Sequence, residues 1–225
     1  MEKRYGLCLK VLRCLQATGV LEDLILVGSW CLYFYKDYFS GTTYTPSIRT
    51  RDIDFLVPIP VRFSHKVDIA ALLKNEGFIT TFSRDGGYIR LEHPELIIEF
   101  LVPEKGRGAK GPYPLPHIGV NAQPLRFLDF LADNVTSVDL QGLRIKVPHP
   151  AAFALHKLLI FKRRRTIEKQ LKERREALYV LKVLISMGNS EIIVSKFNSM
   201  HTSWQKKIQS VLRELEETEI LKILQ

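Results

Sequence analysis

A change of pattern at Pro148 and Pro150 constrains the fold of this chain more than any other feature. Before it, short apolar runs that end in glycine or proline alternate with helical patterns, which is typical of buried strands between helices. After it, apolar residues recur at helical spacing almost to the end of the chain. We therefore expect an α+β fold, with a small mixed β-sheet flanked by helices in residues 1–150 and a mainly helical domain in residues 151–225.

The same patterns predict the individual elements. In the first part, the predicted helices cover residues 3–18, 30–39 and 66–75. The predicted strands cover residues 24–27, 53–57, 78–82, 88–92, 96–102 and 126–131, and further short strands lie around 138–147 with a turn at Gly142. In the second part, the predicted helices cover residues 151–165, 167–187, 190–198 and 202–223. Residues 103–117 hold four prolines and three glycines, which predicts a loop or connection without regular structure.

The composition excludes a membrane-spanning or secreted chain. Of the 225 residues, 46% are hydrophobic and 25% are charged, as in ordinary globular proteins. No run approaches the roughly 18 apolar residues of a membrane helix, and the N-terminal segment lacks a signal-peptide core. Cys8, Cys14 and Cys31 form no Cys-x-x-Cys pair and are predicted to be core residues in a reduced compartment. We expect a soluble cytoplasmic protein without a membrane partner.

Positive charge is concentrated in the second part of the chain. The formal net charge is +9; residues 151–225 carry 15 Lys and Arg against 8 Asp and Glu, which leaves 18 against 16 for the remainder. This asymmetry favours a polyanionic partner such as a nucleotide or RNA. The alternative is a solvated helix face without a partner.

The segment RTRDIDFLV (49–57) places two carboxylates in an apolar run. Side chains alternate along a strand, so Asp52 and Asp54 share one face while Ile53 and Phe55 face the core. Two carboxylates about 7 Å apart on one strand repel each other unless a cation lies between them. The pair therefore predicts a site for Mg²⁺ (or Mn²⁺), which prefers oxygen ligands.

A third acid stands alone in the apolar run LIIEFLV (96–102). Burying Glu99 in a strand is costly unless it faces a metal ion or a charged partner. We predict that it completes a two-metal site with Asp52 and Asp54. The alternative is that Asp52 or Glu99 forms an ordinary ion pair with an arginine: Arg49, Arg51 or Arg90.

A glycine and a serine follow the first predicted strand, at Gly28 and Ser29. A glycine between a strand and a helix lets the backbone approach a phosphate, and a serine at the helix N-terminus can donate a hydrogen bond to it. The turn is therefore a candidate phosphate-binding element that precedes the acid pair.

Together these residues resemble the nucleotidyltransferase superfamily, whose members share the DNA polymerase β-type fold. Its pattern is a Gly-Gly or Gly-Ser turn, then Asp-x-Asp or Asp-x-Glu on the next strand, then a third acid on a later strand. The segments TRDIDF (50–55) and HKLLIFKRRRTIEKQLKERREAL (156–178) are similar to the branch that contains abortive-infection toxins and their bacterial relatives.

The resemblance implies roles for residues in the first part of the chain. It implies that the three acids, Asp52, Asp54 and Glu99, are both catalytic and metal-binding, with Glu99 as a candidate base. It also implies that four further residues bind the nucleotide: Gly28, Ser29, Thr50 and Arg51.

The resemblance extends to the basic helix in the second part. It implies that Lys157 and Arg163 contact the triphosphate and that Lys169 lines the same cleft. Arg164 stays an alternative to Arg163, because seven residues from Lys157 it shares a helix face with that lysine better. The branch's late acidic position corresponds to Glu173 or Glu176.

These features predict a metal-dependent nucleotidyltransferase. It would move a nucleoside monophosphate from an NTP to a hydroxyl of RNA, tRNA or protein and release pyrophosphate. The alternative is a non-catalytic nucleotide- or RNA-binding module on the same fold, as part of a toxin–antitoxin pair. The heptad-like pattern at the C-terminus favours a packing helix, with a homodimer contact as a further alternative.

Overall fold

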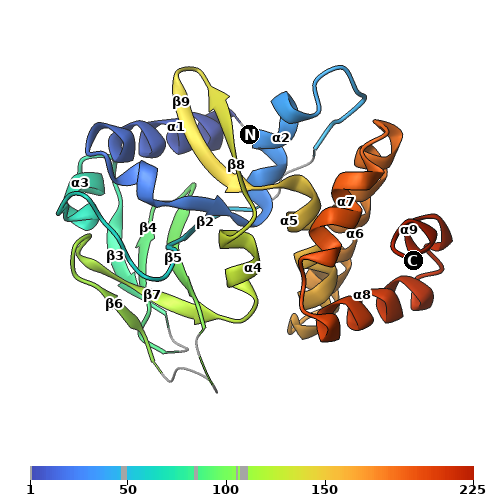
Figure 1. Cartoon of the computed structure of the whole chain (residues 1–225). Helices are drawn as coiled ribbons and strands as arrows, with labels where there is room; N and C mark the ends of the chain where they lie inside the picture. The colour runs from blue at the N-terminus through green and yellow to red at the C-terminus, as the bar shows by residue number, and fades with distance from the viewer. Residues whose placement is uncertain (1, 47–49, 84–85, 105, 107–110) are drawn as a thin grey trace. The chain divides into compact units, whose positions relative to one another are not determined.

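The computed structural model describes residues 2–46, 50–83, 86–104, 106 and 111–225. They form two compact units: an α+β unit, Met1–Tyr38 with Thr45–Val147, and a helical unit, Phe39–Tyr44 with Pro148–Gln225 (Figure 1). The predicted α+β class, with a mixed sheet flanked by helices, is confirmed. No helix in the described ranges is long and apolar enough to cross a membrane.

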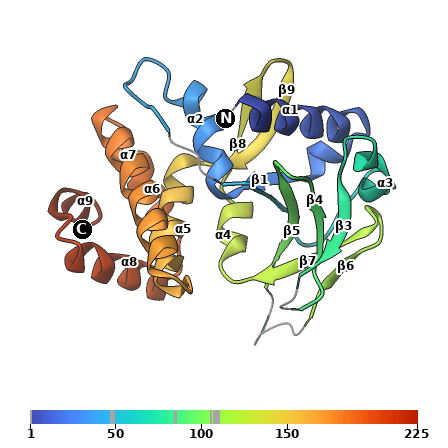
Figure 2. The ribbon, with the colours of Figure 1, turned by 180° about the vertical axis from the view of Figure 1, so that it is seen from behind.

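A mixed seven-stranded sheet forms the centre of the α+β unit as the structure describes it (Figures 1 and 2). Its strands follow the order β1–β2–β5–β4–β3, and β7 pairs with β5 and β6. β2 is parallel to β5 and β5 is parallel to β7, whereas the other pairs are antiparallel. The strands are β1 (Ile25–Val27), β2 (Asp52–Leu56), β3 (Ile79–Phe82), β4 (Ile89–Glu92), β5 (Ile97–Pro103), β6 (Tyr113–Leu115) and β7 (Val120–Leu125).

One face of this sheet is apolar because side chains alternate along β2 and β5. Ile53 and Phe55 on β2 and Ile98 and Phe100 on β5 are buried, as the sequence predicts for β2. The two phenyl rings stack with their centroids 5.9 Å apart. Each such side chain contributes about 1.5–3 kcal/mol by leaving water. The opposite face is mixed, because it bears polar residues as well as buried Leu56 and Leu101.

Helices border the sheet where the sequence predicts them. They are α1 (Glu2–Ala17), α2 (Cys31–Tyr38) and α3 (Ile69–Lys74). α1 and α3 lie side by side (Figures 1 and 2). α3 begins later than predicted, because Asp68 caps it by accepting a hydrogen bond from the Ala71 amide at 3.0 Å. A separate two-stranded sheet holds β8 (Val135–Leu140) and β9 (Leu143–Pro148).

The structure corrects the prediction for residues 103–132. β6 lies inside the proline-rich segment that was expected to lack regular structure, although its residues 105 and 107–110 are outside the described ones. Pro114 is tolerated there because β6 is an edge strand, where a missing N–H need not pair. β7 was not predicted, and the strand predicted at residues 126–131 is wrong: α4 (Leu128–Ala132) is a helix, a choice that short apolar runs leave ambiguous.

The helical unit contains the predicted helices, with one correction. They are α5 (Pro150–Ile160), α6 (Ile167–Ser186), α7 (Ser190–Asn198), α8 (Thr202–Glu214) and α9 (Thr218–Ile223), with a 3₁₀ turn, η3 (Phe161–Arg163), after α5. The single helix predicted at residues 202–223 is wrong, because the chain turns at Glu216 with φ 56°. The turn lets Ile220 and Leu224 become buried, and α9 packs against α8.

Candidate active site

The three predicted acids lie on one face of the sheet. Asp52 and Asp54 occupy alternate positions of β2, on the face opposite Ile53 and Phe55. Glu99 on β5 is the register partner of Asp54. Neighbouring strands lie about 4.8 Å apart, so these two side chains leave the sheet next to each other. Parallel pairing of β2 and β5 therefore joins acids from two distant segments of the chain.

Gly28 lies against the acid pair. β1 and β2 pair Val27 with Asp54, which brings the following residue beside the Asp54 carboxylate. A Cβ added to Gly28 would lie 2.5 Å from Asp54 Oδ2, and the backbone there has φ +77°, which favours glycine. Ser29, the next residue, is buried and lies in the 3₁₀ turn η2 (Gly28–Trp30). The structure thus brings the predicted Gly-Ser turn and the acid pair together.

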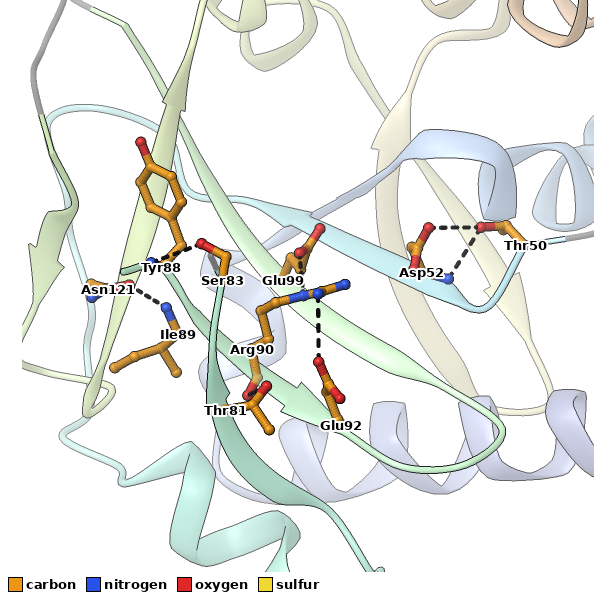
Figure 3. A network of polar contacts seen from close by, with 10 residues as sticks. All are labelled: Thr50, Asp52, Thr81, Ser83, Tyr88, Ile89, Arg90, Glu92, Glu99 and Asn121. Carbon is orange, nitrogen blue, oxygen red and sulfur yellow. Dashed lines mark hydrogen bonds and ion pairs between the residues drawn. The ribbon is translucent and has the colours of Figure 1, made fainter. Parts of the chain in front are cut away.

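Glu99 forms an ion pair with Arg90. Arg90 Nε on β4 lies 2.7 Å from Glu99 Oε1, and Arg90 Nη1 lies 3.5 Å from Glu92 Oε1 (Figure 3). Burial raises the pKa of Glu99; Arg90 opposes this, but Asp52 and Glu92 add to it, so the pKa stays above its ordinary value. The alternative of an arginine pair is therefore realised for Glu99. Arg49, another candidate partner in that alternative, lies outside the described residues.

Thr50 and Arg51 differ in their relation to the acids. Thr50 Oγ1 donates to Asp52 Oδ2 at 3.3 Å and accepts from the Asp52 amide at 3.1 Å, so it holds the first acid at the start of β2 (Figure 3). Arg51 Nη2 instead donates to the carbonyl oxygen of His93 at 2.9 Å, in the turn between β4 and β5. By strand alternation, Arg51 lies on the face opposite the acids.

The donor set suits a hard divalent cation. It consists of carboxylate oxygens on one sheet face. Burial and then the negative charge of Asp52 disfavour the ionised form of Glu99, whereas Arg90 favours it. Within the described ranges, however, no group of three or more His, Cys, Asp or Glu side chains is placed to hold a metal ion. Glu99 is turned toward Arg90 and Asp52 toward Thr50, so metal binding would require these side chains to reorient.

Lys157 is buried in the helical unit and already has anionic partners. Its side chain is paired with Glu173, and its Nζ lies 2.7 Å from Glu176 Oε2. Burial alone would lower the pKa of Lys157, but Glu173 and Glu176 raise it above its ordinary value. The amine is therefore protonated, and the two carboxylates neutralise its charge. A phosphate that bound it would have to compete with them.

The basic residues after α5 separate into two groups. Arg164 Nη2 lies 2.6 Å from Glu173 Oε1, so Arg164 shares this carboxylate with Lys157. Arg163 lies in η3 and is exposed, as is Lys169 in the first turn of α6. The late acids Glu173 and Glu176 are thus partners of Lys157. Their spacing of 16 and 19 residues from it gave no periodic signal, because the contact joins two different helices.

A cavity of about 300 Å³ in the α+β unit lies apart from the three acids. Ile25, Val57 and Lys146 are among the residues that line it, and Asp52, Asp54 and Glu99 are not. The Lys146 side chain donates to the Glu22 carbonyl oxygen at 2.6 Å beside it. The candidate site therefore rests on the polar sheet face rather than on this cavity.

A family model described as nucleotidyltransferase matches residues 7–195. No curated protein matches the sequence. Among solved structures, the chain is similar to an antigenic nucleotidyltransferase-like protein from Paracoccidioides brasiliensis, with 15% identity and a TM-score of 0.48 over 96% of this chain and 92% of that one.

Two further solved structures are similar at comparable levels. ANT(2″)-Ia in complex with adenylyl-2″-tobramycin shows 15% identity and a TM-score of 0.47, over 82% of this chain and 94% of that one. The Megavirus polyadenylate synthase shows 12% identity and a TM-score of 0.39, over 82% of this chain and 32% of that one.

Proposed function

The chain belongs to the nucleotidyltransferase family, and from this premise we propose that it moves a nucleoside monophosphate from an NTP to a hydroxyl acceptor. The acceptor oxygen would form a bond to the α-phosphorus as the bond to the β-phosphate oxygen breaks and pyrophosphate leaves. The observation that carries this proposal is the register of Asp54 with Glu99, on the sheet face that also bears Asp52.

The proposed roles follow from the surroundings of each acid. Asp52, Asp54 and Glu99 would hold Mg²⁺ or Mn²⁺, which when bound neutralises phosphate charge and activates a hydroxyl. Glu99 is the proposed base, because its carboxylate lies on the acid-bearing face beside Asp54. Arg90 would orient Glu99 by keeping hold of one of its oxygens. Thr50 would orient Asp52.

Each unit, taken by itself, has its own proposed nucleotide-binding residues. In the α+β unit, the backbone at Gly28 and Ser29 offers a close approach for a phosphate, with Thr50 just before β2. The nucleotide-binding role of Arg51 stays a prediction, because its side chain bonds the His93 carbonyl oxygen. In the helical domain that we propose for residues 151–225, exposed Arg163 is the proposed triphosphate contact. The role of Lys157 at the triphosphate stays a prediction, because Glu173 and Glu176 already neutralise it.

RNA is the proposed acceptor class. The supporting observation is the charge of residues 151–225, with 15 Lys and Arg against 8 Asp and Glu. A polynucleotide end carries the hydroxyl that the reaction needs, and its phosphates match this excess of positive charge. A role in a toxin–antitoxin pair follows from the family resemblance alone and would appear as growth arrest on expression.

Replacing Asp54 with asparagine tests the proposed function. We expect Asp54→Asn to abolish Mg²⁺-dependent incorporation of label from an α-phosphate-labelled NTP into RNA, because the amide keeps the shape but loses the charge that faces the cation. The matched control is Asp139→Asn on β8, which removes an exposed carboxylate outside the site and should leave incorporation unchanged. Calorimetry that shows NTP binding without turnover and without Mg²⁺ dependence would favour a non-catalytic module instead.

Replacing Gly28 with alanine tests the contact between the turn and the acid pair. The added methyl group would displace the Asp54 carboxylate, and we expect the transfer rate to fall by about 100-fold, as for a misplacement of about 1 Å. Gly142→Ala is the control, because Gly142 has φ +79° but no atom within 4 Å of the added Cβ. Both variants should lose about 1–2 kcal/mol of stability from backbone strain. Equal activity of the two variants would show that the contact is irrelevant.

A further inference from the structure

Basic side chains from three segments lie on the surface of the helical unit. Residues 162–169 are exposed, and Lys162, Arg163, Arg165 and Lys169 lie among them. Lys162 pairs with Glu214, which places η3 beside α8. The positive charges of Arg163 and Lys162 act electrostatically on Lys207 of α8. We call Lys162, Arg163, Arg165, Lys169 and Lys207 the basic surface.

The surroundings of Lys207 disfavour its charged form. Burial lowers the pKa of Lys207, and the positive charges of Arg163 and Lys162 lower it further. Two neighbouring acids have partners of their own: Glu214 pairs with Lys162, and buried Glu173 pairs with Lys157 and Arg164. Like charges held together in this way are relieved when a polyanion binds and displaces counterions.

An aromatic side chain borders the basic surface. Trp204 is partly exposed and lies three residues before Lys207 on α8, so the two side chains share one side of the helix. Ile167, at the start of α6, adds an apolar side chain that is 75% exposed. A positive groove or surface with an aromatic side chain on which a base can stack is the usual chemistry of single-strand binding.

We propose that the basic surface binds single-stranded RNA, with phosphates at its Lys and Arg side chains and a base stacked on Trp204. The inference rests on the proposed function, because it assigns the docking surface of the acceptor. It also has content of its own: RNA should bind the full chain in the absence of NTP and divalent cation. A phospholipid surface is less suited, since it offers no base for Trp204.

A salt titration tests this proposal. The probe is a fluorescein-labelled oligouridylate of about 20 nucleotides, and its anisotropy is followed with the full chain between about 0.05 and 0.2 M salt without NTP or Mg²⁺. The triple variant Arg165→Gln, Lys169→Gln, Lys207→Gln should lower the slope of log K against log salt by about 2, since each single-strand phosphate contact contributes about 0.7. At 0.15 M salt we expect binding about 50-fold weaker.

A triple variant with the same change of charge is the control. Lys3→Gln, Lys74→Gln and Arg144→Gln remove exposed charges on α1, α3 and β9, and should leave the slope and affinity unchanged. If both triple variants weaken binding equally, the effect is one of net charge and the proposal is overturned. Binding to phosphatidylserine vesicles but not to oligouridylate would also overturn it.

Tryptophan emission gives an independent readout. The chain has two tryptophans, and Trp30 is 1% exposed, so quenching by oligouridylate reports on Trp204. Trp204→Phe should abolish the quenching and keep most of the affinity, because phenylalanine still offers a ring for stacking. Quenching that survives in this variant would contradict the stacking. RNA binding without nucleotide transfer would contradict only the proposed function. Transfer to RNA that is unchanged in the triple variant of the basic surface would contradict only this inference.

Discussion

Glu99→Gln is expected to slow nucleotidyl transfer by about 10²- to 10⁴-fold and, at neutral pH, to stabilise the fold. The rate falls because glutamine can neither accept the proton of the hydroxyl nor offer a charged oxygen to a cation. The fold gains because burial and then Asp52 disfavour the ionised form of Glu99 more than Arg90 favours it, which keeps its pKa above the ordinary value. A site residue whose removal stabilises the protein is typical of functional acids.

The pH dependence of this gain has a definite sign. With a raised pKa, folded Glu99 binds more protons than unfolded Glu99, so its ionisation reduces stability as pH rises from the ordinary carboxyl range through the raised pKa. The urea midpoints of wild type and Glu99→Gln should therefore coincide in acid and separate at neutral pH. Glu92→Gln is the matched control, since Glu92 also contacts Arg90 but is outside the proposed acid set, and it should keep its activity. A destabilised Glu99→Gln would mean that the Arg90 pair outweighs burial.

Lys157→Ala is expected to destabilise the helical unit by about 3–5 kcal/mol. The reason is that Glu173 and Glu176 would remain buried without their shared cation. The measurement is urea-induced unfolding of the full chain, with amide exchange in α5 and α6 to locate the loss. Lys182→Ala is the control, because Lys182 pairs with Glu217 at 2.9 Å with its side chain 52% exposed, and such exposed pairs contribute about 0–1 kcal/mol.

The same variant separates the two interpretations of Lys157. A structural cation predicts a large loss of stability that Glu173→Gln with Glu176→Gln partly restores, because the buried negative charge is then gone as well. A triphosphate ligand predicts unchanged stability and a raised KM for NTP.

Burial alone raises the pKa of Glu173, but Lys157 and Arg164 together lower it below its ordinary value. The stabilisation from this pair should therefore be present above the ordinary carboxyl range and be lost as pH falls through the lowered pKa.

Local patterns predicted elements of both units. The alternation of Asp52, Ile53, Asp54 and Phe55 predicted which side chains face the core, and the burial of Ile53 and Phe55 confirms it. The predictions failed where the local signal was weak or was overridden. The apolar run at Leu128–Ala132 is too short for its period to separate helix from strand, and the proline-rich segment holds a strand because β7 pairs with it.

The sequence by itself determined the periodicity of the elements, the acid pair on one face of β2 and the excess of positive charge after Pro148, because each depends on residues near one another in the chain or on simple counts. Only the tertiary structure decided that Glu99 lies beside Asp54, that Asp54 touches Gly28 and that Arg90 pairs with Glu99. It also decided that Lys157 is enclosed by Glu173 and Glu176. These contacts join distant segments through strand register and helix packing, which many weak interactions across the whole core select together.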